Sequence, residues 1–235
     1  MGAIYKREML SYFTSSIGYI FVAVFLAMTA GFYSIFTLFQ GKQSSLSSFF
    51  IIIMFVYAIM VPLLTMKSFS EERKTRTEQL LLTSPVSITG MVLGKFFSSY
   101  TMFAGSFVLS CLNFYTLFRY GEPNVGVLVS YSVGILLIGA AYTAVGIFIS
   151  SLTENQLIAA FATMGVLVLM LVLAFVNGFI DFYPVRVVLN WLSIYGRFSN
   201  FTFGILDISS LFYYFSICFV FIFLTVRVYD KRRWS

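Results

Sequence analysis

The chain has 235 residues, of which 60% are apolar and only 10% are charged, with a net charge of +6 and no histidine. This composition, with a mean hydropathy of +0.93, excludes an ordinary soluble domain, in which about a quarter of the residues are charged. Alternating strands of a membrane barrel are absent from the sequence, and uncharged runs of this length satisfy their backbone as helices. We therefore expect an all-α integral membrane protein with one membrane domain, residues 1–235.

Residues 1–16 have the pattern of a helix lying along the membrane surface. Ile4, Tyr5, Met9 and Tyr12 share one helical face, and Lys6 and other polar residues lie opposite. We expect an interfacial helix here, and the alternative is a simple N-terminal extension of the first membrane span.

Six stretches without Asp, Glu, Lys or Arg are each long enough to cross a bilayer, which needs about 20 apolar residues. They cover residues 9–41, 43–66, 96–118, 123–153, 155–180 and 208–226. Within them we place six spans at residues 17–39, 49–66, 96–118, 125–150, 157–180 and 211–226.

The cationic residues are divided unequally between the two sides that these spans define. Four lie on the side away from the N-terminus (Lys42, Arg119, Arg186 and Arg197), and the other eleven of the fifteen lie on the N-terminal side. Because cytoplasmic segments carry the excess of Lys and Arg, both termini are predicted to be cytoplasmic. The positive charge suits a lipid bilayer with anionic headgroups, and no motif for nucleic acid occurs.

The segment between the second and third spans, from Lys67 to Lys95, holds eight charged residues, more than any other segment between two spans. Ser70 can cap a helix whose first turn contains Glu71 and Glu72. Glu72 with Arg76, and Lys74 with Glu78, are four residues apart and suit the same helix. We expect a short amphipathic helix over residues 68–84, which is either a surface anchor or a docking element.

The fourth span is rich in small residues at a spacing of four. The pairs are Gly139 with Thr143, Ala140 with Ala144, and Gly146 with Ser150. Such spacing lets helix backbones approach closely, so this span is predicted to lie inside the bundle or at a seam between subunits.

The segment of residues 177–210 lies on the outer side and is apolar throughout much of its length. A long solvated loop of that composition is unfavourable. We expect one or two short helices that dip into or rest on the outer leaflet, covered by other protein where the backbone is broken. A flat interfacial helix with no gating role is the alternative.

Several motifs of the chain resemble a known family. They are Phe69-Ser-Glu-Glu-Arg, Thr77-Glu-Gln-Leu-Leu-Leu, Ser84-Pro-Val-Ser and Val92-Leu-Gly-Lys in the charged segment, with Tyr5-Lys-Arg-Glu, Gly204-Ile-Leu-Asp and Arg232-Arg-Trp towards the two ends. Together they resemble type-2 ABC exporter permeases, with the greatest likeness to the gliding-motility-associated branch. Many relatives carry Gly-Thr where this chain has Arg76-Thr77.

The resemblance implies functions for three segments. Residues 68–84 would be the coupling helix that contacts an ATPase, through Ser70, Glu71, Glu72, Arg73, Thr75, Arg76, Thr77, Glu78, Leu81 and Leu82. The interfacial helix would also touch the ATPase, through Tyr5, Lys6, Arg7 and Glu8. Residues 177–210 would be re-entrant helices that gate the outer side, through Trp191, Phe198, Asn200, Phe201, Gly204 and Asp207.

The resemblance also implies partners and a location. The chain would be the transmembrane permease of an ATP-driven exporter in the bacterial cytoplasmic membrane, forming half of the pathway. Its partners would be a cytoplasmic ABC ATPase dimer, a second copy or a related permease, and an accessory membrane subunit with an extracellular domain. ATP and Mg would bind to the ATPase, because this chain contains no Gly-x-x-x-x-Gly-Lys-Ser or Thr motif and is predicted to bind no cofactor.

Two other classes were weighed. A free-standing secondary carrier or channel is disfavoured because no span has an ionisable residue near its middle. The pattern Glu71-Glu72-x-x-x-Arg76 also occurs in CAAX-type intramembrane proteases, but this chain lacks the histidines that hold their metal. We therefore predict no catalytic residues and no metal site, and the sequence leaves the transported substrate open.

Overall fold

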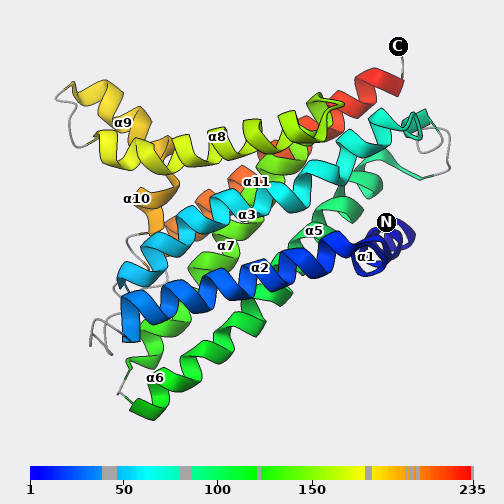
Figure 1. Ribbon diagram of the computed structural model, residues 1–235. Helices are drawn as coiled ribbons and strands as arrows, with labels where there is room; N and C mark the ends of the chain where they lie inside the picture. Colours follow the sequence, from blue (N-terminus) through cyan, green and yellow to red (C-terminus); the bar gives the residue numbers. More distant parts are fainter. Residues whose placement is uncertain are drawn as a thin grey trace.

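The structure is a computed structural model that describes residues 1–38, 47–79, 86–120, 123–177, 182–198, 201, 204 and 207–233. All regular structure in these residues is helical (Figure 1). The helices are α1 (Gly2–Thr14), α2 (Ser16–Tyr33), α3 (Ser47–Lys74), α5 (Ile88–Ser110), α6 (Phe114–Tyr120), α7 (Val125–Leu152), α8 (Gln156–Val176), α9 (Tyr183–Leu192), α10 (Ile194–Phe198) and α11 (Ile208–Arg233). A π-helical turn, Ser34–Leu38, follows α2, and a 3-10 turn, Cys111–Asn113, joins α5 to α6.

The prediction of six membrane spans is confirmed within the described residues. The long apolar helices cover Ser16–Thr37, Ser48–Lys74, Ile88–Tyr120, Val125–Leu152, Gln156–Val176 and Ile208–Arg233. Two of them are longer at their charged ends than the sequence indicated. The second continues to Lys74, and the third begins at Ile88, where the Ser87 side chain accepts a hydrogen bond from the Gly90 amide.

Both termini lie at one end of the bundle, together with the end of α3, the start of α5 and the turn between α7 and α8 (Figure 1). We call this the terminal end. The opposite end holds α6, α9 and α10. This arrangement follows from an even number of spans, which returns the chain to the side on which it began.

Helix α7 is the central helix of the bundle, in contact with α3, α5, α8 and α11. Its small residues allow this. A Cβ atom at Gly139 would lie 1.9 Å from the Phe103 ring, and one at Gly146 would lie 2.2 Å from the Thr65 hydroxyl. The small-residue spacing therefore goes with a place inside the bundle, which is one of the two predicted positions of this span.

Helix α1 is separate from the first span, so the alternative of a simple extension is wrong. Ser15 is extended and breaks the helix, and Gly18 of α2 then packs against the Tyr12 carbonyl, where a Cβ atom would lie 2.2 Å away. Helix α1 packs on α5. Its Tyr12 hydroxyl donates to the Leu64 carbonyl over 3.1 Å and is 3.0 Å from the Ser99 hydroxyl. These contacts fix the elbow between α1 and α2.

Two short helices, α9 and α10, lie between α8 and α11, in agreement with the prediction of short helices in this segment. Their apolar residues complete the core at the opposite end. Phe198 and Phe201 are fully buried, and Phe198 contacts Tyr131 of α7 with 5.7 Å between ring centroids. The Tyr214 hydroxyl of α11 donates to the Ile194 carbonyl over 3.0 Å. The segment is thus tied to both α7 and α11.

Candidate functional site

The end of α3 is the most heavily bonded part of the charged segment, and it differs from the prediction. Ser70 does not begin a helix, because α3 continues through it from the membrane span. The Ser70 side chain is fully buried and donates to the Ser150 carbonyl over 3.0 Å. The Ser150 hydroxyl accepts from the amides of Phe69 and Ser70 over 3.1 and 3.2 Å. Ser70 therefore joins α3 to α7.

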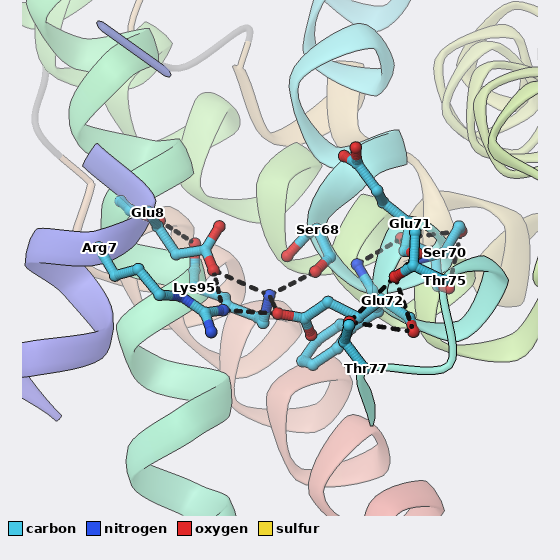
Figure 2. A network of polar contacts seen from close by, with 12 residues as sticks. Arg7, Glu8, Ser68, Ser70, Glu71, Glu72, Thr75, Thr77 and Lys95 are labelled. Atoms are coloured by element: carbon cyan, nitrogen blue, oxygen red, sulfur yellow. Dashed lines mark hydrogen bonds and ion pairs between the residues drawn. The ribbon is translucent and has the colours of Figure 1, made fainter. Parts of the chain in front are cut away.

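A buried lysine from α5 ties this end of α3 to α1. The Lys95 side chain is only 1% exposed. Its amine lies 3.1 Å from a Glu8 carboxylate oxygen and 2.9 Å from a Glu72 carboxylate oxygen, and it donates to the Ser68 carbonyl. Figure 2 shows Glu8 and Glu72 reaching the amine from either side. A charge buried this deeply is stable only when it is paired and hydrogen-bonded, and here it is both.

Arg7 completes this cluster. Its guanidinium donates to Glu8 over 2.7 Å and also to Glu72, so the two carboxylates share two cations. Burial disfavours the charged form of Glu8, but the neighbouring charges of Lys95 and Arg7 outweigh it and hold the pKa of Glu8 below its ordinary 4.5. Burial alone would lower the pKa of Arg7, yet its contacts with Glu8 and Glu72 raise it. Both groups are charged at neutral pH.

A second ionic cluster joins the end of α3 to α7 and α11. The Arg73 guanidinium lies 2.7 Å from Glu154 and 3.6 Å from Glu78, and it donates to the Leu152 carbonyl over 3.1 Å. Arg232 of α11 lies 3.3 Å from Glu78 and donates to the Ser151 carbonyl over 2.8 Å. Residues 68–78 therefore contact α1, α5, α7 and α11 together, and we call them the α3 junction.

The pairs predicted within one helix, Glu72 with Arg76 and Lys74 with Glu78, are wrong because α3 ends at Lys74. The Thr77 amide donates to the Glu72 carbonyl and the Arg76 amide to the Arg73 carbonyl, which is the Schellman ending of a helix. Arg76 takes a φ of 57°, the left-handed region that glycine adopts most easily. The chain therefore makes this turn with an arginine in place of a glycine.

The predicted coupling residues thus divide into two sets. Ser70, Glu72, Arg73 and Glu78 point into the junction and bond to other helices. Glu71, Thr75, Arg76 and Thr77 are exposed, as is Lys74 between them. Leu81 and Leu82 lie outside the described residues. We call residues 74–77 the exposed tip.

A polar cavity of about 610 Å³ opens between α1 and the α3 junction. It is lined by Arg7, Glu8, Ser11, Lys67, Ser68, Glu71, Glu72, Thr75, Thr77 and Lys95. Of the interfacial residues predicted from the sequence, Arg7 and Glu8 reach this cavity. Tyr5 instead donates to the Thr101 hydroxyl over 3.3 Å, and Lys6 is exposed.

Of the residues predicted for the outer gate, those that the structure describes lie at the opposite end and do not form one cluster. Trp191 is 65% exposed, whereas Phe198 and Phe201 are buried against α7. Asp207 accepts from the Ser209 amide over 3.0 Å at the start of α11. Gly204 has a φ of +75° and packs on Val127. Asn200 lies outside the described residues.

Lys95 and Arg232 are central to the junction. Both belong to motifs that carry the family resemblance, but neither is among the predicted site residues. The sequence does contain a signal for Lys95, which is its small neighbour Gly94 near the start of a span. A small residue lets another helix approach closely, and a lysine beside it can then be buried. A Cβ atom at Gly94 would lie 3.1 Å from the Ile4 side chain, which shows how closely α1 passes. Arg232 offered no such signal, because it lies in a run of cations.

A family model described as "ABC-2 family transporter protein" matches residues 33–228. Because the match covers most of the chain, this protein belongs to the ABC-2 transporter family. It is a multi-pass membrane component of an ABC transporter, a permease and not itself the catalytic component. No curated protein matches the chain. The match contains Glu72, Arg73 and Lys95, whereas Arg7 and Glu8 lie before it.

Proposed function

We propose that this chain is one permease subunit of an ATP-driven exporter and that a separate cytoplasmic ATPase moves it through the exposed tip of the α3 junction. Family membership supports the permease role. The sequence contains no phosphate-binding Gly-x-x-x-x-Gly-Lys-Ser or Thr motif, so the nucleotide would bind to the partner.

The observation that carries this proposal is the convergence of four helices on one short stretch of α3. Glu72 bonds to α1 and α5, Ser70 bonds to α7, and Glu78 bonds to α11. A force applied to the exposed tip would therefore reach each of these helices through short polar contacts. Rigid-body rocking of the bundle between inward-open and outward-open states follows from such a connection.

The same proposal assigns orientation and partners. The terminal end would face the cytoplasm, as the excess of Lys and Arg there favours. A second copy or a related permease would complete the pathway in the bacterial cytoplasmic membrane, with an ATPase dimer inside and an accessory subunit outside. We assign the chain to the gliding-motility-associated branch on the motifs of the charged segment, with export as the direction.

At the opposite end, α9 and α10 would be the re-entrant outer gate. In support of this, Phe198 and Phe201 are seated against Gly134 of α7, where a Cβ atom would lie 2.8 Å from the Phe198 ring. Movement of α7 would unseat both rings. Arg197 lies 5.9 Å from the Trp191 ring and 5.8 Å from the Tyr213 ring, and so links α9 to α11.

The test of the proposal uses the exposed tip, because replacement of Glu72, Arg73 or Glu78 would break contacts within the chain itself. Lys74→Glu with Arg76→Glu should release the ATPase from purified complexes while the permease stays folded. Lys231→Glu, also exposed at the terminal end, is the matched control and should leave copurification unchanged. Full retention of the ATPase by the tip variant would contradict docking there.

The carrier or channel alternative has its own test. The purified chain alone, in vesicles with an ion gradient and no ATPase, should transport nothing. Transport under those conditions would replace the proposal with a free-standing carrier.

A further inference from the structure

An apolar groove of about 190 Å³ runs between the parts of α2 and α3 nearest the terminal end. It is lined by Ile17, Ile20 and Val24 of α2 and by Met60, Leu63 and Met66 of α3, with Phe21 at its base. Each wall covers about 10 Å along its helix at 1.5 Å per residue. No polar side chain enters this lining, and both helices are membrane spans. The groove therefore faces hydrocarbon.

A small cleft lies between the groove and the polar cavity at the α3 junction. This cleft of about 30 Å³ shares Ile17 with the groove and shares Lys67 and Glu71 with the polar cavity. Lys67 directly follows the groove residue Met66. An apolar channel that ends at hydrogen-bonding and charged groups matches a molecule with a hydrocarbon tail and a polar head.

The charges at this polar end are balanced. The cavity and the cleft are lined by three cations, Arg7, Lys67 and Lys95, and by three carboxylates, Glu8, Glu71 and Glu72. Four of these six groups bond to one another in the cluster around Lys95. The remaining two form the loosest pair, with 3.8 Å between the Lys67 amine and the Glu71 carboxylate, and Glu71 is largely exposed.

One weakly paired cation beside one weakly paired carboxylate suits a zwitterion better than an anion. A phosphate can accept from the Lys67 amine and from the hydroxyls of Ser11 and Ser15, which also line the cleft. A primary ammonium can donate to the Glu71 carboxylate. A quaternary ammonium donates no hydrogen bond and is held by aromatic cages. Among the described residues, Tyr12 is the only aromatic side chain in the polar lining, and one ring does not form a cage.

We propose that this groove binds one phospholipid of the aminophospholipid class, such as phosphatidylethanolamine, with an acyl chain between α2 and α3 and its headgroup at Lys67 and Glu71. On one side the bound lipid contacts the elbow between α1 and α2. On the other side it contacts α3, one turn before the junction. This assignment requires only that the chain is a membrane protein, so it does not depend on the proposed coupling to an ATPase.

The test is photo-crosslinking of the full chain in nanodiscs of phosphatidylcholine and phosphatidylglycerol that contain a trace of phosphatidylethanolamine with a diazirine in its acyl chain. Cross-linked peptides are mapped by mass spectrometry. We expect labelling to concentrate on residues 17–24 and 60–66 rather than on Phe212, Phe215, Phe219 and Phe223 of α11, whose apolar side chains are also exposed. Equal labelling of α11 would overturn the proposal.

Two matched variants separate the groove from general lipid contact. Leu63 and Leu224 are 37% and 38% exposed in different membrane helices. Leu63→Trp fills the groove and should lower its labelling about tenfold, because it excludes several methylene groups from apolar contact. Leu224→Trp should leave that labelling unchanged. Equal effects of both variants would overturn the assignment.

The headgroup is tested by competition. Unlabelled phosphatidylethanolamine should displace the probe, whereas phosphatidylcholine and phosphatidylglycerol should do so poorly. Glu71→Gln should remove the preference over phosphatidylglycerol, since it leaves Lys67 without a carboxylate beside it. Equal competition by all three lipids in the unmodified protein would overturn the headgroup assignment, and unchanged size-exclusion elution of the variants verifies that they are folded.

Discussion

The two ends of the helix bundle hold their helices together by different kinds of contact. At the terminal end, charged and hydroxyl side chains join α3 to four other helices, with Lys95 and Ser70 buried at the centre. At the opposite end, the rings of Tyr131, Phe198 and Phe201 fill the space between α7 and α10.

This difference suits the two ends to different tasks. An ion pair or hydrogen bond requires its partners at a fixed distance and direction, so the terminal end keeps its helices in register. Packed rings are held by non-directional burial and can shift over one another at lower cost. Under the proposed function, the terminal end would transmit a movement of the ATPase, and the opposite end would yield to that movement.

Removal of the buried cation should have the largest effect. Lys95→Met leaves Glu8 and Glu72 facing each other with only Arg7 between them, and loss of one partner of a buried ion pair costs about 3–5 kcal/mol. We expect a large fall in the thermal unfolding midpoint in detergent. Lys67→Met, at the more exposed Lys67–Glu71 pair, is the control and should change the midpoint little.

The cause of that loss can be tested with a second change. Adding Glu72→Gln to Lys95→Met removes one of the unpaired carboxylates and leaves Glu8 with Arg7. The double variant should recover part of the midpoint. A double variant that is less stable than Lys95→Met alone would contradict the charge argument.

Truncation of a buried ring should have the next largest effect, at the opposite end. Phe198→Ala removes a fully buried side chain and should cost about 3 kcal/mol. Trp191→Ala removes a ring that is mostly exposed, so its effect should be small. An unchanged unfolding midpoint for Phe198→Ala would contradict the view that packed aromatic rings stabilise the opposite end.

A glycine at the turn after α3 should stabilise the protein modestly. Arg76 adopts a left-handed conformation that costs a non-glycine residue about 1–2 kcal/mol. Arg76→Gly should therefore raise the unfolding midpoint, and Arg76→Ala, which removes the charge and keeps the Cβ atom, should not. Equal effects of the two variants would assign the change to the charge instead of the backbone.

Acidification should weaken the terminal end by the smallest amount. The folded pKa of Glu8 lies below its ordinary value of 4.5, so the stability that Glu8 contributes is present above that pH and is lost as the pH falls through the folded value. Glu8→Gln should be less stable at neutral pH and should show a flatter pH dependence below about 4.5. Parallel pH profiles for both proteins would exclude Glu8 as the titrating group.

The membrane spans could be predicted from the sequence because their signal is local. Runs of apolar residues fix where a helix crosses the bilayer, and the small residues of α7 indicate close packing. The two short helices before α11 were also predicted, since an apolar outer segment must be covered.

The α3 junction could not be derived in the same way, because its bonds depend on how distant segments meet. Ser70 and the two glutamates after it have the pattern of a helix N-terminus, yet α3 continues through Ser70. The Ser150 hydroxyl of α7 accepts a hydrogen bond from the Ser70 amide. The sequence spacing predicts an ion pair between Glu72 and Arg76, but the ion-pair partners of Glu72 in the structure are Lys95 and Arg7. Ion pairs predicted from the spacing within one helix are wrong where residues from other helices offer a competing partner.

The central claim is that the α3 junction moves as one unit with α1. Spin labels at Leu10 and Thr75, both exposed, measure the distance between α1 and the exposed tip. A second pair at Thr75 and Tyr115 measures the distance from the tip to the opposite end. Cys111 and Cys218 are replaced by serine in both cases. On addition of ATP to the complex with the ATPase, the account predicts an unchanged distance for the first pair and a shifted distance for the second. A shift in the first pair, with α1 moving away from the tip, would contradict it.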